Sequence, residues 1–334
     1  MKKLIALITS ALLIVSLLSA CGQASNPDSS SAAPTEKAKI NAVAIAGPTG
    51  IGLVDLMQKN KLGNATNDYT FTVVNDPQQA VGALVNKSAD IAAVPTNLAS
   101  TLYKKTNGNV QVLAVNTLGV LSILENGNTI QSVADLKGKT IYTSGQGANP
   151  EYILRYVLEK NDIDPDKDVK IEFVQDNDAL ATLVNNNTAK VAMVPEPKAT
   201  VCLKQNTAVR IALDMTKEWN KVANDTSRLM MGCVVARKDF VQANGDAVKK
   251  FLAEYKASIG AVVTNVENAA QLCASHGIIP QAPIALQAIP NCNLTYVDGA
   301  QMKKELSGYL KVLFNYNPKA IGGEMPADDF YYAG

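Results

Sequence analysis

The stretch Asp-Ile-Ala-Ala-Val-Pro-Thr-Asn at residues 90–97 organises this sequence, because a buried strand there stops at a proline and a helix begins directly after it. The same pattern returns as Lys-Val-Ala-Met-Val-Pro-Glu-Pro at residues 190–197. We align the preceding helix ends, Ala-Leu-Val-Asn at 83–86 and Thr-Leu-Val-Asn at 182–185. These repeats predict two matched halves. If both are open α/β sheets, the chain beyond each strand end forms a crevice rim, where such sheets bind ligands.

Composition and charge limit the class of protein. The chain has 334 residues, of which 47% are hydrophobic and 18% charged, values typical of soluble protein, and its length predicts two domains. The net charge is +1, and without Lys2 and Lys3 there are 29 basic and 30 acidic residues. This balance argues against nucleic-acid binding. Internal apolar runs are shorter than the roughly 20 residues needed to span a bilayer.

The first residues indicate an exported protein. Residues 1–20 combine a charged start, an apolar run from Leu4 to Leu18, and small residues before Cys21, which resembles a bacterial lipoprotein signal peptide. Under this interpretation Cys21 becomes the acylated N-terminus and anchors the protein on the extracytoplasmic face of the cell membrane. A cytosolic helix, or an ordinary signal peptide with an incidental cysteine, is the alternative. Residues 21–38 are rich in Ser, Ala and Pro and predict a flexible tether.

The remaining chain alternates strands and helices in two similar runs. Strands are expected at residues 39–46, 69–74, 91–94 and 110–115 in the first half, and at residues 140–143, 169–174, 191–194 and 209–213 in the second. Residues 116–124 and 229–236 are expected to cross between the halves. From Asp239 onward the pattern is mostly helical and is expected to rejoin the first half. Two crossovers joining two open sheets predict a hinge that can close around a ligand.

At this point the chain resembles the solute-binding lipoproteins of ABC importers, in the branch that includes nitrate, sulfonate, taurine and thiamine-pyrimidine binders. The resemblance covers nearly everything after the tether, and it depends on residues 46–50, 91–95, 133–141 and 248–255, of which Ala-Asp-Leu-Lys-Gly-Lys at 134–139 is the most specific. It implies two α/β lobes of the type II periplasmic-binding fold, each an open mixed sheet flanked by helices. It also implies a small-molecule solute, ABC permease subunits as partners, and no cofactor.

We therefore assign the residues of the chain to two lobes and to a ligand-binding site. Residues 39–120 and 237–334 are assigned to lobe 1, and residues 121–236 to lobe 2, in a protein that is expected to be monomeric. Four strand-to-helix turns, at residues 47–50, 95–97, 144–147 and 195–197, should meet at the cleft and offer unpaired backbone N–H groups. Their glycines let a ligand approach the main chain. The predicted ligand-binding residues are Pro48, Thr49, Gly50, Thr96, Asn97, Asn116, Ser144, Gly145, Gln146, Gly147, Glu196 and Trp219.

The chemistry of these turns bears on the solute. Glu196 would disfavour an anion and accept a hydrogen bond from an amine, or it simply complements the dipole of its own helix. None of the four turns carries Arg or Lys at its tip, which weakens nitrate or sulfonate as the solute, although Lys198 or Arg228 could approach from elsewhere. Trp219, the only tryptophan, would stack on a flat organic solute or pack on its own lobe.

The sequence argues against catalysis. His276 is the only histidine and lies at a predicted helix end, and the cysteines after Cys21 form no CxxC pair, so no metal site is predicted. Those four cysteines are Cys202, Cys233, Cys273 and Cys292; they allow three arrangements of two disulfides, with Cys273–Cys292 weakly favoured, or they stay reduced. A ligand-sensing lipoprotein receptor is an alternative function. A synthase-like enzyme on the same fold is a less favoured one, because it needs an iron-binding cysteine motif and an active-site histidine.

Overall fold

The structure is a computed structural model and describes residues 37–223 and 227–334. The predicted signal peptide at 1–20, Cys21 and all but the last two residues of the predicted tether lie outside the described residues. Within the described ranges, no helix is both long and apolar enough to cross a membrane.

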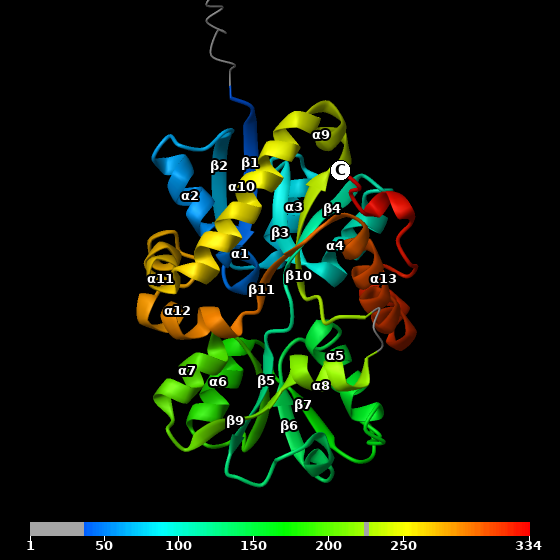
Figure 1. Ribbon diagram of the computed structural model, residues 1–334. Coiled ribbons are helices and arrows are strands. Elements are labelled where there is room, and N and C mark those ends of the chain that lie inside the picture. The colour runs from blue at the N-terminus through cyan, green and yellow to red at the C-terminus, as the bar shows by residue number, and fades with distance from the viewer. Residues whose placement is uncertain (1–36, 224–226) are drawn as a thin grey trace, which may run out of the picture. The chain divides into compact units, whose positions relative to one another are not determined.

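The first of two mixed sheets has six strands in the order β11-β4-β10-β3-β1-β2 (Figure 1). Strands β1, β2 and β3 are parallel, whereas β10 runs antiparallel to both β3 and β4, and β11 antiparallel to β4. We call this sheet with its helices the first lobe. Its strands are β1 (Lys39–Ile45), β2 (Asp68–Val74), β3 (Ile91–Pro95), β4 (Val110–Thr117), β10 (Gly232–Arg237) and β11 (Leu294–Val297).

The second sheet has five strands in the order β7-β6-β8-β5-β9 and, with its helices, forms the second lobe. Strand β6 is parallel to β7 and β8, and β5 is antiparallel to β8 and β9. Its strands are β5 (Leu121–Asn126), β6 (Thr140–Thr143), β7 (Lys170–Phe173), β8 (Val191–Pro195) and β9 (Val209–Asp214). Read from the other edge, this order matches β4-β10-β3-β1-β2 strand for strand, which confirms the prediction of two matched halves.

The repeated segment shows the match at the level of single residues. Lys87 and Asn187 both follow a helix C-cap in the left-handed conformation, with φ of 63° and 64°. The side chains of the two caps, Asn86 and Asn186, accept from the backbone N–H of the second residue beyond them, at 2.9 and 3.0 Å. The helix ends therefore correspond with an offset of 100 residues. Our sequence alignment, which used an offset of 99 there, was wrong by one residue.

Helices cover the faces of both sheets. The first lobe carries α1 (Pro48–Ile51), α2 (Val54–Lys61), α3 (Pro77–Val85), α4 (Thr96–Lys105), α9 (Lys238–Ala243), α10 (Gly245–Thr264), α11 (Val266–Ser275), α12 (Ala282–Ala288) and α13 (Gly299–Tyr316). The second carries α5 (Asn149–Glu159), α6 (Asn177–Asn185), α7 (Lys198–Gln205) and α8 (Met215–Val222). Short 3₁₀ helices lie at η1 (Val133–Leu136), η2 (Ile289–Asn291), η3 (Pro318–Ile321) and η4 (Asp328–Phe330).

Two crossovers join the lobes. The first is the short link of residues 118–120 between β4 and β5, and the second leads through residues 229–231 into β10. Because β10 pairs with β3 and β4, it belongs to the first lobe. Our assignment of residues 121–236 to lobe 2 therefore extended too far, since the apolar run that we interpreted as crossover becomes sheet from Gly232 onward.

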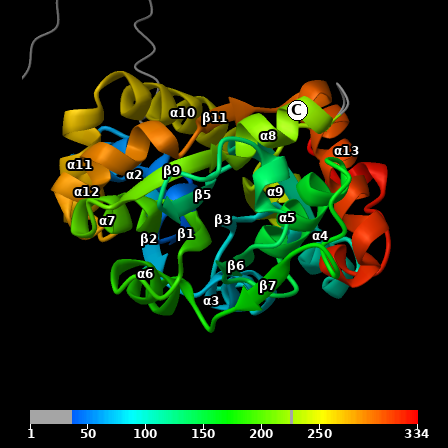
Figure 2. The ribbon, with the colours of Figure 1, turned by 90° about the horizontal axis from the view of Figure 1, so that it is seen from below.

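The lobes also touch on both sides of the crossovers. Helix α13 of the first lobe packs against α5 of the second, and α12 lies beside α7, as Figures 1 and 2 both show. On the α13 side, buried side chains of the two lobes form one continuous apolar cluster. This core connects the two sheets through the aromatic residues of α5, α8 and α13.

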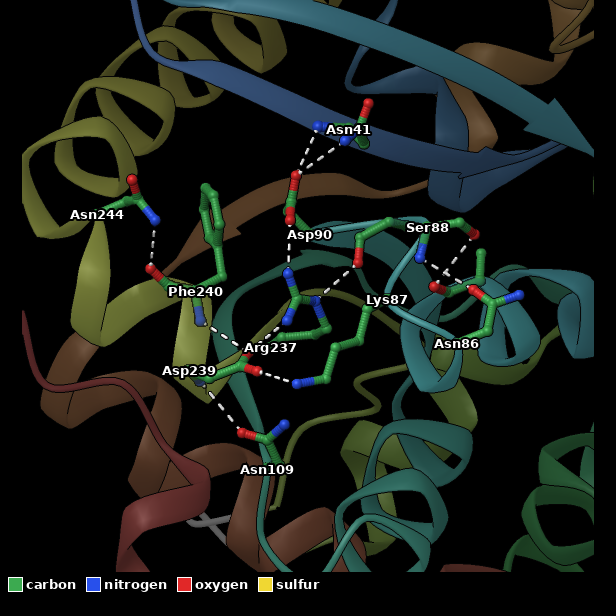
Figure 3. A network of polar contacts seen from close by, with 12 residues as sticks. Asn41, Asn86, Lys87, Ser88, Asp90, Asn109, Arg237, Asp239, Phe240 and Asn244 are labelled. Atoms are coloured by element: carbon green, nitrogen blue, oxygen red, sulfur yellow. Dashed lines mark hydrogen bonds and ion pairs between the residues drawn. The ribbon is translucent and has the colours of Figure 1, made fainter.

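A polar network fastens one end of the first sheet (Figure 3). Arg237, at the end of β10, pairs with Asp90 at 2.7 Å and with Asp239 at 2.5 Å, and its Nε donates to the Ala89 carbonyl. Asp90 in turn accepts from the backbone N–H of Asn41 at 2.8 Å. The returning strand is thereby tied to β1 and to the start of β3.

The four cysteines of the described chain are free and buried. The weakly favoured Cys273–Cys292 disulfide is therefore not formed in this structure. Each thiol lies in an apolar cluster, as expected for a cysteine that acts as a small hydrophobic residue.

Candidate functional site

Two of the four predicted turns lie directly against the crossovers. The backbone N–H of Thr96 donates to the Met231 carbonyl at 3.1 Å, and the N–H of Glu196 donates to the Val120 carbonyl at 2.9 Å. The two contacts match each other in the two halves. In each half, the residue after the proline that ends a strand binds the crossover that leads into the same sheet. The two turns therefore adjoin the junction between the lobes.

The first turn is built around glycine. Gly47 has φ of 109° and donates its N–H to the Ile278 carbonyl at 2.9 Å, and Pro48 opens α1. A Cβ at Gly50 would lie 2.3 Å from the carbonyl oxygen of Ile45, so the turn requires glycine at this position for packing. Thr49 stays partly exposed and can reach a ligand.

Asn116 holds the first turn in place. Its side chain is buried, and its Nδ2 donates to the Thr49 carbonyl at 3.2 Å and to the Tyr255 hydroxyl at 2.8 Å. Its Oδ1 accepts from the Thr117 hydroxyl at 2.9 Å. Because both donors and the acceptor are used inside the protein, the structure makes Asn116 a positioning residue. Our prediction of direct ligand contact by Asn116 is corrected accordingly.

In the second turn, Thr96 and Asn97 have different roles. Thr96 is fully buried, and its hydroxyl donates to the Met230 carbonyl at 2.7 Å, so its side chain fixes the second crossover and cannot contact a solute. Asn97 is partly exposed, and among the described residues its side-chain amide has no hydrogen-bond partner. Its backbone N–H lies in the first turn of α4, where no intrahelical acceptor is available. Asn97 therefore remains a candidate ligand contact.

The third turn keeps two residues free for a ligand. The Ser144 hydroxyl donates to Asn177, and the Gly147 N–H donates to the Glu151 carboxylate at 2.7 Å. Gly145 and Gly147 have φ of 76° and 73°, a conformation that favours glycine. Within residues 37–223 and 227–334, the exposed Gln146 side chain and the Gly145 N–H have no hydrogen-bond partner.

Sequence reasoning missed Asn149, two residues beyond the third turn. This first residue of α5 is 4% exposed, and its buried Oδ1 has no hydrogen-bond partner among the described residues. A buried polar atom of this kind calls for a partner. The signal in the sequence was the Asn-Pro pair at residues 149–150, one residue after the Gly-rich turn.

In the fourth turn, Glu196 is buried rather than presented to solvent. It is 4% exposed; its Oε2 accepts from the Thr200 N–H at 3.2 Å, and its Oε1 has no partner within the described residues. Burial raises the pKa of Glu196, although the hydrogen bonds from Thr200 act in the opposite direction. Burial, and then the nearby Glu196 carboxylate, raise the pKa of the Cys292 thiol. Helix α7, which begins two residues after Glu196, lies beside α12 of the first lobe.

The raised pKa of Glu196 predicts a pH dependence of stability. Below the usual value of 4.5 the carboxyl is protonated in both folded and unfolded chains, and its contribution to stability is fully present. As the pH rises through the folded-state pKa, ionisation in the buried site removes that contribution. The melting temperature of the wild type relative to Glu196→Gln should therefore fall from about pH 4 to about pH 8. A constant difference over this range would contradict the assignment.

Trp219 is not part of the site. Its side chain is 0% exposed, and its indole N–H donates to the Ser227 carbonyl at 2.9 Å. Its ring packs on Tyr156 of α5 at 4.4 Å and on Tyr309 of α13 at 5.6 Å between ring centroids. The buried position of Trp219 leaves its ring no free face for a solute in this structure, and the ring packs against both lobes rather than on its own lobe alone.

The two cations considered as anion ligands have partners of their own. Lys198 pairs with Asp178, and Arg228 pairs with Glu305 at 3.1 Å. The turns therefore offer backbone amides and neutral side chains to a ligand.

A crevice of about 360 Å³ lies away from the four turns, between α5 and α13. It is lined by Tyr156, Glu159, Lys160, Val312, Asn315 and Tyr316.

The chain is similar to known proteins in sequence and in fold. A family model described as "ABC transporter, phosphonate, periplasmic substrate-binding protein" matches residues 53–281, more than half of the chain. A search of curated proteins found no match.

Solved structures share the fold at low sequence identity. An ABC transporter protein from Parabacteroides distasonis superposes with a TM-score of 0.74 at 21% identity, covering 89% of this chain and 99% of that one. The aliphatic sulphonate-binding protein SsuA from Escherichia coli gives 0.70 at 16% identity, covering 88% and 92%. The nitrate-binding protein NrtA from Synechocystis gives 0.55 at 16%, covering 76% and 69%. These likenesses confirm the predicted two-sheet periplasmic-binding fold.

Proposed function

Because this chain belongs to the phosphonate family of periplasmic substrate-binding proteins of ABC transporters, we propose that it captures a small organic molecule outside the cytoplasm and delivers it to a membrane permease. This family consists of binding proteins, which confirms the prediction that the chain is not an enzyme. The observation that carries the proposal is the matched pair of turns at Thr96 and Glu196. Each adjoins a crossover, so a solute held there would be sensitive to the angle between the lobes.

We propose that the main chain supplies most of the recognition. Helix α4 begins within the second turn, and α5 and α7 begin one or two residues after the third and fourth. N–H groups in the first turn of a helix bind ligand oxygens. Asn97, Gly145 and Gln146 add available groups around them. Since Lys198 and Arg228 are paired with acids, the arrangement favours a solute whose oxygens accept from amides over one that needs a salt bridge.

A thermal-shift screen tests the solute. Phosphonates, sulfonates, nitrate, pyrimidines, flavins and amines should be compared on the purified protein. A ligand at about 100 times its Kd adds about 2.7 kcal/mol to the free energy of unfolding, which is roughly a 5 °C rise in melting temperature. No shift with any class, together with no small molecule detected by mass spectrometry of the purified protein, would sink the proposed function.

The second turn gives a matched pair of variants for the same assay. Asn97→Ala should weaken binding and change the free energy of unfolding by less than about 0.5 kcal/mol, because the partly exposed Asn97 side chain makes no hydrogen bond to the described residues. Thr96→Ala should instead lower that free energy by about 1–3 kcal/mol, because it removes the buried bond to Met230. Unchanged affinity in Asn97→Ala would move the site away from this turn.

We further propose that the protein acts as a monomer anchored through a lipid on Cys21. The signal-like segment supports the anchor, and the presence of all four turns on one chain supports the monomer. The mass of the N-terminal peptide from membrane-derived protein checks the lipid, and size-exclusion chromatography checks the monomer. An unmodified N-terminal peptide would contradict the lipid anchor, and a stable dimer would contradict the monomer.

A further inference from the structure

The short first crossover is held by hydrogen bonds from both lobes. The Leu118 N–H donates to the Asn293 carbonyl at 3.1 Å, and the Asn293 side chain donates back to the Gly119 carbonyl at 2.6 Å. From the second lobe, the Glu196 N–H donates to the Val120 carbonyl at 2.9 Å. Three successive residues of the link thus have a fixed partner, and one residue, Asn293, provides two of these bonds.

Asn293 adopts a backbone conformation suited to this role. Its φ is 45°, in the left-handed region, where asparagine is the side chain best tolerated after glycine. The next residue, Leu294, begins β11 and pairs with Thr117 at the end of β4. The strand therefore fixes the position of Asn293, and the left-handed turn directs both its carbonyl and its side chain to the crossover. Local strain of this kind persists where the surrounding structure imposes it.

The second crossover packs against the same point. A Cβ at Gly119 would lie 2.1 Å from the Thr216 hydroxyl oxygen and 2.6 Å from a Leu229 methyl carbon. Leu229 belongs to the segment that leads into β10. The two crossovers are therefore in contact at Gly119, whose carbonyl is the one that Asn293 binds.

Hydrogen bonds connect this point to the proposed ligand turns. Asn116, at the end of β4, binds the Thr49 carbonyl of the first turn, and Glu196 belongs to the fourth. A rotation of the crossover would move both turns. We propose that Asn293 is a positioning residue for solute binding: its bonds to Leu118 and Gly119 set the resting angle between the lobes without contact with the solute. This inference does not depend on which solute is bound.

The test compares two chemically identical substitutions in the full chain. Asn293→Gly keeps a left-handed backbone accessible and removes only the side-chain bond to Gly119. Asn107→Gly is the matched control, because Asn107 also has a positive φ, of 52°, but lies between α4 and β4, where its N–H binds Lys104. Spin labels at Lys105→Cys and Lys190→Cys, exposed positions on the two lobes, report the interlobe distance in a Cys21→Ser background, while the four buried cysteines stay unlabelled.

Asn293→Gly should broaden the distribution of label distances in the absence of solute. The amides of Leu118 and Glu196 should exchange hydrogen about fivefold faster, as expected for the loss of one hydrogen bond. Asn107→Gly should change neither quantity. Wild-type distances and exchange in Asn293→Gly, or equal changes in both variants, would overturn the proposal. Because these readouts need no ligand, a failure of the solute screen would leave this result intact and count only against the proposed function.

Discussion

Replacing Trp219 by alanine is expected to lower the free energy of unfolding by about 3–5 kcal/mol, the range for removing a large aromatic side chain from a core. Trp219 is 0% exposed and packs between Tyr156 of the second lobe and Tyr309 of the first. Its removal leaves a cavity at the seam between the lobes and also leaves the Ser227 carbonyl without its indole donor. Urea unfolding followed by circular dichroism measures the loss.

Trp219→Phe is the control that separates packing from ligand contact. Phenylalanine retains most of the apolar volume and loses the hydrogen bond to Ser227, so the loss of stability should be clearly smaller than for alanine. Affinity for any solute found in the screen should stay at the wild-type value. A Trp219→Phe protein of near-normal stability that no longer binds would show that the tryptophan contacts the solute after all.

Arg237→Ala is expected to lower the free energy of unfolding by about 3 kcal/mol, near the lower end of the range for breaking a buried ion pair. The Arg237 and Asp90 side chains are 12% and 11% exposed, and Asp90 also binds the Asn41 backbone (Figure 3). Without the guanidinium, the Asp90 carboxylate stays largely buried with no opposite charge. The hydrogen bond from Arg237 of β10 to the Ala89 carbonyl is also lost. Chemical unfolding of the variant gives the value.

Lys87→Ala provides the matched comparison within the same network. Lys87 pairs with Asp239 at 2.8 Å, as Arg237 does, but its side chain is 63% exposed. Exposed pairs contribute about 0–1 kcal/mol, so this variant should be close to wild type. A double-mutant cycle of Arg237→Ala with Asp90→Asn should show coupling between the two sites. If the losses of unfolding free energy in the cycle were additive, or if Lys87→Ala and Arg237→Ala lost equal amounts, the role of burial would be contradicted.

The strand ends and the duplicated halves could be predicted from sequence, whereas the lobe boundary and the short elements could not. Buried apolar runs that stop at Pro95 and Pro195 fix both strand and turn, because proline ends the ladder. Helix α8 was missed although Met215, Trp219 and Val222 have helical spacing, since the residues between them are mostly polar. Strand β11 was missed because it interrupts a segment whose pattern is otherwise mostly helical.

The site was predicted less well for a physical reason. Whether a turn residue is free depends on partners far along the chain, such as the bond from Asn116 to Tyr255 across 139 positions or from Thr96 to Met230 across 134. No local pattern reveals that these side chains are already engaged. The positions of the turns could be inferred from strand ends, but the division between contact and positioning residues required the tertiary structure.

The order in which the strands occur along the chain has a consequence for maturation. All five strands of the second sheet come from residues 121–214, so that sheet can form as soon as this part has emerged. The first sheet cannot, because β10 must be inserted between β3 and β4, and β10 ends only at Arg237. Until then β3 and β4 have open edges in the middle of the sheet, where unpaired backbone invites aggregation. The first sheet is thus completed later than the second, and a product cut short just before residue 232 would contain all strands of the second sheet but lack β10 and β11 of the first.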